Sequence, residues 1–285
     1  MQYKKSKDKI IITDLTQFNP KHILECGQVF RFKKINDDYI VYSLDKKAVI
    51  SKIIENNKLV AYQIQTKDVD YFEEYFALKQ DYNLIKNNVL NLINSDFMKD
   101  AIDFGYGIRI LKQNYLEATI SFVISQNNNI KRIQLIIENL CKNFGANMGD
   151  FYAFPTLRQL NKVTEKDFKK MGAGYRASYL VETIKWLNNF DYNNFINLSF
   201  DNQQKQILSV KGIGQKVADC IMLFGYYNMQ VFPVDTWIDK VYREYFCKDK
   251  DEKLDRIKIR NSLVDIFKNY SGYAQQYLFY YRRSK

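Results

Sequence analysis

A lysine and an aspartate carry the strongest chemical signal in this sequence, because each stands at the start of an apolar helical pattern. Lys216 lies in KGIGQKVADCIML (residues 211–223), in the first predicted helical turn after Gly214. Desolvation and the positive end of the helix dipole favour the neutral amine there, and a neutral amine is a nucleophile. Cys220 follows at i+4 on the same helix face. The alternative is an ordinary solvated lysine.

Asp235 is the second member of the pair. In VFPVDTWIDKVY (residues 231–242) it follows Pro233 and precedes an apolar helical pattern, so we predict that it is an N-cap. A carboxylate held by helix N–H groups stays ionised and can stabilise a developing positive charge. The capping role does not exclude the chemical one. Lys216 and Asp235 are 19 positions apart (235 − 216), enough for a helix and a return loop, so they can share one cleft.

Two glycines, Gly212 and Gly214, flank Ile213 between two helical patterns and predict a helix-hairpin-helix. Glycines allow backbone conformations that a side chain would forbid. N–H groups at the start of the second helix, including that of Gln215, could then bind a DNA phosphate without reading the sequence. The alternative is a plain corner between two helices.

Composition agrees with a polyanionic partner. The 285 residues include 43 Lys+Arg against 32 Asp+Glu, a net charge of +11. Such an excess favours nucleic acid or an acidic membrane surface, although a merely basic soluble protein has the same property.

Other classes of protein are disfavoured by what the sequence lacks. The four cysteines are far apart and form no C-x-x-C pair, so a zinc or iron–sulfur site has no local scaffold. The single histidine, His22, removes His-based catalysis. Neither a signal peptide nor an apolar run of membrane-spanning length is present. We therefore expect a soluble, intracellular, reduced protein without a membrane partner.

The spacing of apolar residues changes near residue 67. Before it, alternating runs such as QVFRFKKI, YIVYSL, AVISKII and LVAYQI are separated by turn formers, which predicts an antiparallel meander. After it, the spacing is helical. The predicted class is α+β: an N-terminal antiparallel β-sheet unit with flanking helices (residues 1–103), packed on a larger all-α domain (residues 104–285).

Five segments in this order resemble the helix-hairpin-helix superfamily of DNA glycosylases, and most of all its 8-oxoguanine DNA glycosylase/AP lyase branch. The similarity extends from about Ile23 to Phe279. The segments are CGQVFRF, SQNNNIKRI, MGAGYRASYL, KGIGQKVADCI followed by PVD, and GYAQQYLFYYRR. The missing cysteine cluster separates the chain from the iron–sulfur branches of the superfamily.

The resemblance implies a role for each residue of a base pocket. Lys216 would attack C1′ and form a Schiff base while Asp235 stabilises the positive sugar. The Gly27 carbonyl would accept the N7–H that distinguishes the oxidised base from guanine. Gln275 would bind the Watson–Crick edge and Phe279 would stack on the flipped base, although a core aromatic is the competing interpretation of Phe279. Cys220, as a thiolate beside a Lys216 ammonium, would complete the pocket.

The resemblance also implies a DNA-binding face. Tyr175 would enter the base stack, Asn127 would fill the vacancy, and Arg132 and Arg176 would bind the orphaned cytosine. The structural alternatives are a core tyrosine, a capping asparagine and phosphate-binding arginines. Gly212, Gly214 and Gln215 would hold the backbone at the hairpin.

The implied activity is excision of 8-oxoguanine, with cytosine as the expected opposite base, followed by β-elimination at the abasic site. The implied substrate is double-stranded DNA and the enzyme would be a monomer in the cytoplasm or nucleoid, or in the nucleus of a eukaryote. No redox cofactor, metal or iron–sulfur cluster is expected, although the hairpin carbonyls could bind a monovalent cation. The alternatives are a related glycosylase for another damaged purine and a non-catalytic helix-hairpin-helix module.

Overall fold

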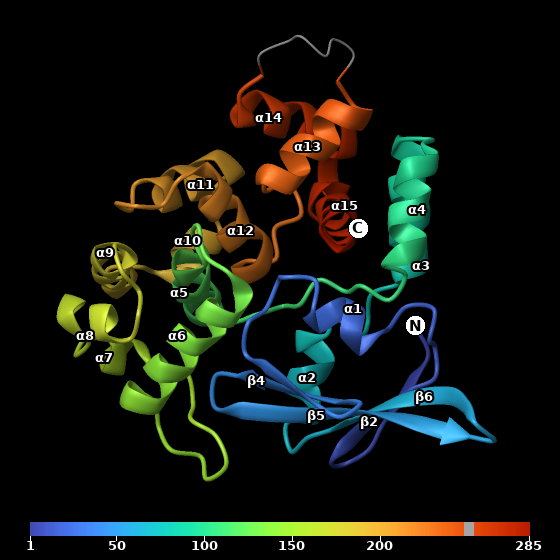
Figure 1. Ribbon diagram of the computed structural model, residues 1–285, viewed down its shortest axis with the longest axis horizontal. Coiled ribbons are helices and arrows are strands. Elements are labelled where there is room, and N and C mark those ends of the chain that lie inside the picture. The colour runs from blue at the N-terminus through green and yellow to red at the C-terminus, as the bar shows by residue number, and fades with distance from the viewer. Residues whose placement is uncertain (248–253) are drawn as a thin grey trace.

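The computed structural model describes residues 1–247 and 254–285. Its N-terminal part is an antiparallel sheet of six strands in the order β1-β2-β6-β5-β4-β3, and the remainder is helical (Figure 1). The strands are β1 (Tyr3–Lys5), β2 (Lys9–Ile12), β3 (Phe32–Ile35), β4 (Asp38–Ser43), β5 (Lys46–Glu55) and β6 (Lys58–Gln65). The predicted α+β class is confirmed.

Strands β3 to β6 form the predicted meander, and asparagines make two of its three turns, while Leu44 has positive φ in the turn between β4 and β5. Asn36 lies between β3 and β4, and Asn56 and Asn57 lie between β5 and β6, all with positive φ. Asparagine tolerates this left-handed conformation better than most side chains. The N-terminal strands β1 and β2 were not predicted. Strand β2 pairs with β6, with Ile10 opposite Ile64, so its partner is distant in sequence.

Fifteen α-helices and one 3-10 helix follow or interrupt the strands in the described residues. The first eight are α1 (Pro20–Leu24), α2 (Val69–Tyr75), α3 (Tyr82–Leu92), α4 (Asp96–Phe104), α5 (Tyr115–Ser125), α6 (Ile130–Phe144), α7 (Leu157–Leu160) and α8 (Glu165–Lys170). The others are α9 (Arg176–Asn188), α10 (Tyr192–Ile196), α11 (Phe200–Leu208), α12 (Gln215–Gly225), α13 (Thr236–Tyr245), α14 (Arg256–Phe267), η1 (Lys268–Tyr270) and α15 (Ser271–Ser284).

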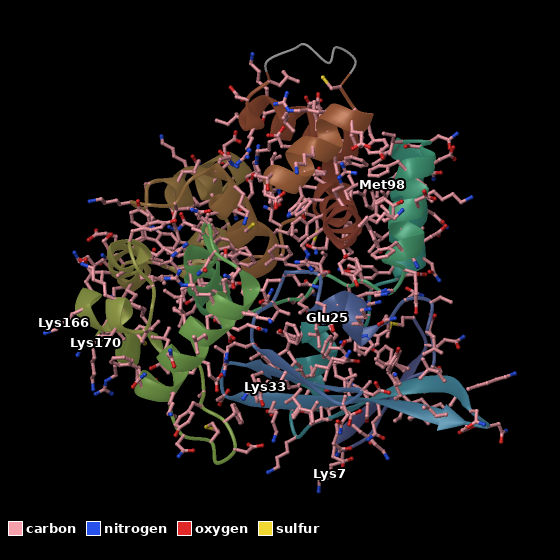
Figure 2. All side chains as sticks on the ribbon, in the orientation of Figure 1. Lys7, Glu25, Lys33, Met98, Lys166 and Lys170 are labelled. Atoms are coloured by element: carbon pink, nitrogen blue, oxygen red, sulfur yellow. The ribbon has the colours of Figure 1, made fainter. Side chains whose placement is uncertain are left out.

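Two hydrophobic cores hold these elements. The smaller lies between the sheet and α2, with Phe72 and Phe76 against Ile50 and Ile64. The larger core is formed by the helices. It includes residues of α3, which packs on α14 and α15, and of α4, which packs on α15. Both helices lie within residues 1–103, the predicted N-terminal unit. Charged side chains such as Lys166 and Lys170 of α8 project from the outer surface (Figure 2).

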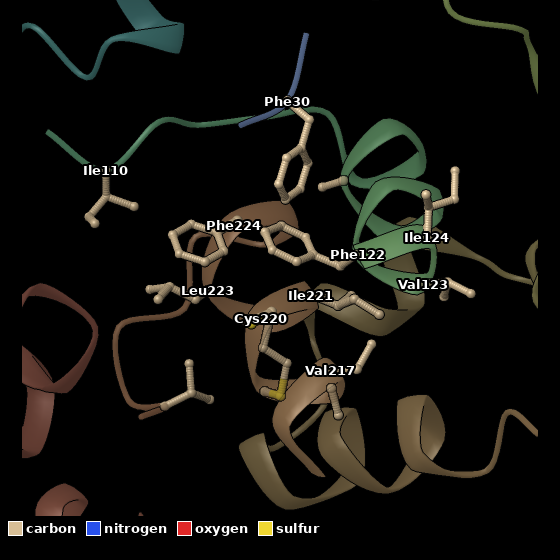
Figure 3. Close-up of a cluster of buried hydrophobic side chains, with 14 of the residues drawn as sticks. Phe30, Ile110, Phe122, Val123, Ile124, Val217, Cys220, Ile221, Leu223 and Phe224 are labelled. Atoms are coloured by element: carbon tan, nitrogen blue, oxygen red, sulfur yellow. The ribbon is translucent and has the colours of Figure 1, made fainter. Parts of the chain in front are cut away.

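A cluster of three phenylalanines brings the segment after α1 against the helical core. Phe30 packs edge-on against Phe122 of α5, with ring centroids 5.5 Å apart, and Phe122 stacks on Phe224 of α12 at 5.1 Å (Figure 3). Residues 25–30, α5 and α12 are therefore fixed relative to one another. Within the described residues, no helix is long and apolar enough to cross a bilayer.

Candidate active site

One cavity collects the predicted base-pocket residues from three distant segments of the chain. It lies where the loop after α1 meets the starts of α12 and α13 and the middle of α15. Its walls include all six of the predicted residues, Gly27, Lys216, Cys220, Asp235, Gln275 and Phe279. Four further lining residues were not predicted: Phe122, Phe224, Pro233 and Gln276. Lys216 and Asp235 thus share one cleft, as their spacing suggested.

Lys216 is the second residue of α12, whose N-cap is Gly214. Cys220 lies one turn further on and is buried. Burial raises the pKa of the Cys220 thiol to about 11, and the charge of Lys216 opposes the shift only in part. The neutral thiol is therefore the dominant form near neutral pH. Burial therefore opposes the thiolate that the family resemblance implies.

Asp235 is the N-cap of α13, as predicted. One carboxylate oxygen, Oδ1, accepts hydrogen bonds from the backbone N–H groups of Trp237 at 2.9 Å and Ile238 at 3.0 Å. These bonds fix the orientation of the carboxylate. The second oxygen, Oδ2, makes no part of the cap and is available to a charge that develops in the cavity.

Gln275 presents a buried acceptor to the cavity. Its Nε2 donates to the carbonyl of Pro233 at 3.4 Å, while its Oε1 is buried without a partner in the part of the chain that the structure describes. A buried acceptor without a donor costs free energy. The site is thus suited to a ligand that supplies N–H donors at this point, and Phe279, one turn later on α15, offers a ring beside it.

Gly27 lies opposite Phe279, where only glycine fits. Its φ is +90°, a conformation that strains other residues. A Cβ at this position would lie 2.8 Å from Nη1 of Arg283 and 3.1 Å from Cε1 of Phe279. Arg283 was not singled out from the sequence, although its spacing of i+4 from Phe279 places both on one face of α15.

The two hairpin glycines have different reasons to be glycine. Gly212 has φ of +91°, and a Cβ there would overlap the ring of Tyr179 on α9. Gly214 has φ of −91°, and among the described residues no atom beyond its chain neighbours lies within 4 Å of the position of its Cβ. The expectation that both glycines adopt conformations forbidden to other residues is therefore wrong for Gly214. Its contribution is open space in front of the first N–H groups of α12.

Gln215 is turned toward the protein interior. Its Nε2 donates to Asp219 at 3.0 Å, and Asp219 forms a buried ion pair with Arg260 of α14 through bonds of 2.6 and 2.9 Å. Of the groups of Gln215, only the backbone N–H lies at the start of α12, where the hairpin prediction puts a phosphate-binding donor. The Asp219–Arg260 pair, which holds α12 against α14, was not found from the sequence.

The predicted wedge residues lie on two loops that contact each other. Asn127 is exposed with φ of +43°, and Tyr175 is 53% exposed at the start of α9. Arg132, in the first turn of α6, donates to the carbonyl of Gly172 at 3.0 Å. Tyr179 then connects this surface to the hairpin, because its ring contacts Tyr175 and packs over Gly212.

Arg176 is the one predicted DNA-binding side chain that is buried. It donates to the backbone carbonyls of Gln126 and Asn127, and its guanidinium lies over the Tyr175 ring at 4.5 Å. Burial lowers the pKa of this guanidinium from its usual range. Arg176 thus positions the loop that carries Asn127.

Among the described residues, no cluster of three or more His, Cys, Asp or Glu side chains could hold a metal ion.

The chain is similar to known proteins over its whole length. Residues 10–119 match the family described as 8-oxoguanine DNA glycosylase, N-terminal domain, and residues 120–265 match that of HhH-GPD superfamily base excision DNA repair proteins. The structure of a Clostridium acetobutylicum 8-oxoguanine glycosylase/lyase, solved with double-stranded DNA containing cytosine opposite 8-oxoguanine, has a TM-score of 0.88 at 35% identity, covering 100% of this chain and 98% of that one.

Curated relatives agree. An N-glycosylase/DNA lyase of Saccharomyces cerevisiae is 28% identical over 298 residues, which cover 93% of this chain and 78% of the yeast protein. An N-glycosylase/DNA lyase of Arabidopsis thaliana is 32% identical over 65% of this chain and 56% of the plant protein. Fold, cavity and both family matches lead to one conclusion: this chain belongs to the HhH-GPD superfamily of base excision DNA repair proteins, in its 8-oxoguanine DNA glycosylase branch.

Proposed function

We infer that the protein is a bifunctional DNA glycosylase that excises 8-oxoguanine from double-stranded DNA, with cytosine as the preferred opposite base, and then nicks the strand at the abasic site. The observation that carries this inference is the cavity in which Lys216, Asp235 and the backbone of Gly27 meet. An amine, a fixed carboxylate and a carbonyl acceptor are the groups needed to attack a sugar, stabilise its charge and sense an added N–H.

Recognition begins with extrusion of the base, which costs a few kcal/mol. We propose that Phe279 stacks on the flipped base and that the unpaired Oε1 of Gln275 accepts N–H groups from its Watson–Crick edge. The Gly27 carbonyl would accept the N7–H of 8-oxoguanine. Guanine has a lone pair at N7, so the same carbonyl would repel it.

The chemistry then uses two side chains of the cavity. As the glycosidic bond breaks, the base leaves with the bonding electron pair and positive charge develops on the sugar, where Asp235 stabilises it. The neutral amine of Lys216 forms a bond to C1′ and loses a proton, and ring opening gives a protonated Schiff base. Loss of a proton from C2′ then expels the 3′ phosphate by β-elimination, and water releases Lys216.

On the DNA face, we propose that Tyr175 wedges into the stack and Asn127 fills the space left by the base. Both are exposed on loops that Arg176 ties together. Arg132 and Arg176 would donate to the orphaned cytosine. Arg176 uses three of its five N–H groups on backbone carbonyls, which leaves two for a base. Gly212, Gly214 and the N–H of Gln215 would hold a phosphate.

We also propose that the chain divides into two parts. Residues 1–103 would position Gly27, and residues 104–285 would carry the chemistry. We further propose that the enzyme acts as a monomer on nucleoid or nuclear DNA and without a redox cofactor. A monovalent cation bound by hairpin carbonyls is also a prediction.

The decisive experiment is borohydride trapping on a duplex with one 8-oxoguanine opposite cytosine. The wild-type protein should become covalently attached to the DNA. The Lys216→Gln variant should lose both trapping and base release, because only the amine can form the imine, while lesion binding stays within about threefold of wild type. Trapping that persists in Lys216→Gln would assign the nucleophile to another lysine.

The two alternatives predict other results. A glycosylase for another damaged purine would excise an alkylated purine faster than 8-oxoguanine. A non-catalytic module would bind the duplex but trap with neither lesion. Rates on the two lesions, measured with one enzyme preparation, therefore separate all three functions.

A further inference from the structure

Three successive residues, Glu25, Cys26 and Gly27, lie beside the C-terminal helix α15. The carbonyl of Glu25 accepts a hydrogen bond from Nη2 of Arg283, and the carbonyl of Cys26 accepts one from Nε2 of Gln276 at 2.8 Å. Within the described residues, no donor reaches the carbonyl of Gly27. Helix α15 therefore holds the first two carbonyls and leaves the third to the cavity.

The Arg283 side chain lies between residues 25–27 and its own helix, α15. Its guanidinium lies over the Phe279 ring, 5.1 Å from the centroid, and Nη1 packs where a side chain at Gly27 would be. One arginine thus contacts both walls of the cavity that would hold the base, the backbone wall at Gly27 and the aromatic wall at Phe279. Glu25 itself, labelled in Figure 2, is tied to β4, since its Oε1 accepts a hydrogen bond of 2.5 Å from the Tyr39 hydroxyl.

The other side of Gly27 is anchored independently. Gln28 is fully buried. Its Nε2 donates to the carbonyls of Ile23 and Arg109, and its Oε1 accepts from the backbone N–H of Leu111, at distances of 2.7 to 2.9 Å. Gly27 has no side chain to restrain it, so its peptide unit is held only through its neighbours. If the Glu25–Cys26 side were released, the left-handed glycine could rotate its carbonyl at little cost.

Discrimination by one carbonyl requires that this carbonyl cannot rotate. A rigid acceptor gains a hydrogen bond from the N7–H of 8-oxoguanine and meets the lone pair of guanine at the same place. A mobile acceptor would turn away from guanine, and the repulsion would be lost. Holding the carbonyl in place therefore affects the selectivity between 8-oxoguanine and guanine more than it affects the rate of the chemical step.

We propose that Arg283 and Gln276 are specificity-determining positioning residues, which fix the Gly27 carbonyl so that the enzyme distinguishes 8-oxoguanine from guanine. The proposal rests on the proposed function of the cavity. Both residues act through the backbone of residues 25–27 and contact no reacting atom.

The test uses the full-length protein in a Lys216→Gln background, in which binding is measured without turnover. The dissociation constants for duplexes with 8-oxoguanine or guanine opposite cytosine give a selectivity ratio. Arg283→Leu keeps the bulk of the side chain and removes the donor, and Gln276→Met does the same at its position. Arg282→Leu is the matched control, because Arg282 is adjacent on α15 but pairs with Glu244 at 2.7 Å.

We expect Arg283→Leu and Gln276→Met each to reduce the selectivity ratio about tenfold, the effect of losing one well-oriented hydrogen bond. Arg282→Leu should leave the ratio unchanged within about twofold. Arg283→Lys, which can still donate to the Glu25 carbonyl, should restore most of the ratio. Without the Lys216 substitution, the Arg283 and Arg282 variants should nick a duplex with a preformed abasic site at the wild-type rate, because that substrate has no base to sense.

Unchanged selectivity in folded Arg283→Leu and Gln276→Met would overturn the proposal. Equal loss in the Arg282→Leu control would do so too, since the effect would then be general to the end of α15. If Arg283→Leu does not fold, Gln276→Met and Arg283→Lys decide. A parent protein that binds both duplexes equally would instead refute the proposed function, so the two failures are distinguishable.

Discussion

Gly27 is subject to two independent constraints, one from its backbone and one from its neighbours. Its φ of +90° disfavours any side chain, and Arg283 and Phe279 occupy the space that a Cβ would need. The first constraint is intrinsic to the residue, and the second exists only because α15 packs on the loop. A substitution here therefore tests the base-sensing wall of the cavity while leaving Lys216 and Asp235 in place.

We expect Gly27→Ala to reduce the excision rate of 8-oxoguanine at least about tenfold, because left-handed strain of about 1–2 kcal/mol adds to a displaced Phe279 or Arg283. Nicking of a preformed abasic site should stay within about twofold of wild type. Single-turnover rates on the two substrates make the comparison.

Gly149→Ala is the matched control, since Gly149 has φ of +96° but, in the part of the chain that the structure describes, no atom beyond its chain neighbours lies within 4 Å of its Cβ position. It should show the strain as lost stability without any effect on excision. Equal losses of excision in both variants would attribute the Gly27 effect to general instability.

The chemistry of individual residues could be predicted where the signal is local. Lys216 and Asp235 are each marked by a helix start within a few residues of sequence, and both line the cavity. Gln276 and Arg283 could not be found in this way. Their partners Cys26 and Glu25 are 250 and 258 positions away, so their role depends on how α15 packs on the N-terminal loop. The protonation state of Cys220 depends on packing in the same way, because burial in the assembled core raises the pKa of this thiol.

At the scale of elements, the hairpin between α11 and α12 separates packing from binding. Gly212 is held beneath Tyr179, whereas the position next to Gly214 is open. Tyr179 belongs to α9, so the hairpin is fixed to the same helix that presents Tyr175 and Arg176. A phosphate bound at the start of α12 and a wedge at the start of α9 would then keep a constant separation on the DNA.

We expect the two hairpin glycines to respond differently to alanine. Gly212→Ala should destabilise the protein by about 2 kcal/mol or more, since strain at φ of +91° adds to overlap with Tyr179. Gly214→Ala should change the unfolding free energy by less than about 1 kcal/mol, the scale of an N-cap substitution.

Despite its stability, Gly214→Ala should weaken DNA affinity equally for damaged and undamaged duplexes, because its methyl group occupies the approach of a phosphate. Urea unfolding and binding at one fixed salt concentration measure both quantities. A Gly214→Ala protein with wild-type affinity for both duplexes would show that the hairpin does not contact the backbone.

The secondary structure could be predicted where sequence neighbours are also structural partners. Strands β3 to β6 pair in sequence order through short turns, so the meander was visible in the alternation. Strands β1 and β2 were not visible, since KIII gains its partner only when β6 arrives beside it. In the same way, α3 and α4 follow the sheet in sequence but complete the larger core, where α15 supplies their apolar neighbours.

At the scale of the whole molecule, the N-terminal unit and the helical domain are joined by polar as well as apolar contacts. Arg31 and Glu117 form a buried ion pair at 3.2 Å, and Glu117 also accepts from the backbone N–H of Leu44 at 2.7 Å. On the opposite side of the sheet unit, α1 packs on α15 through His22, whose ring lies 5.6 Å from that of Tyr280. The cavity is lined by Gly27 of the N-terminal unit and by residues of the helical domain, so its geometry depends on how the two parts are joined.

His22, the single histidine in the sequence, makes the second connection sensitive to pH. Burial, with a smaller contribution from Lys21, lowers the pKa of His22 to about 4. Its Nδ1 accepts a hydrogen bond from the N–H of Gly107 at 3.4 Å, which also requires the neutral ring. In the unfolded chain the pKa returns to about 6.5. Between these values the unfolded state binds more protons than the folded state, so stability falls as the pH falls below about 6.5.

We therefore expect the unfolding free energy to fall by about 1 kcal/mol between pH 7 and pH 5, after allowance for solvent screening of a ring that is not fully buried. Carboxylates contribute little in this interval, because their ordinary pKa values lie near 4. His22→Asn keeps an acceptor for Gly107 but cannot be protonated, so it should lose this pH dependence. Urea unfolding of both proteins at several pH values is the measurement. Parallel curves for the two would mean that His22 is protonated at no cost.

Because α1 ends immediately before Glu25, and Tyr280 follows Phe279, a proton on His22 would act next to both walls of the cavity. The folded protein, however, keeps His22 neutral until the pH approaches 4, so lesion selectivity should not change between pH 7 and pH 5 in the wild type or in the variant.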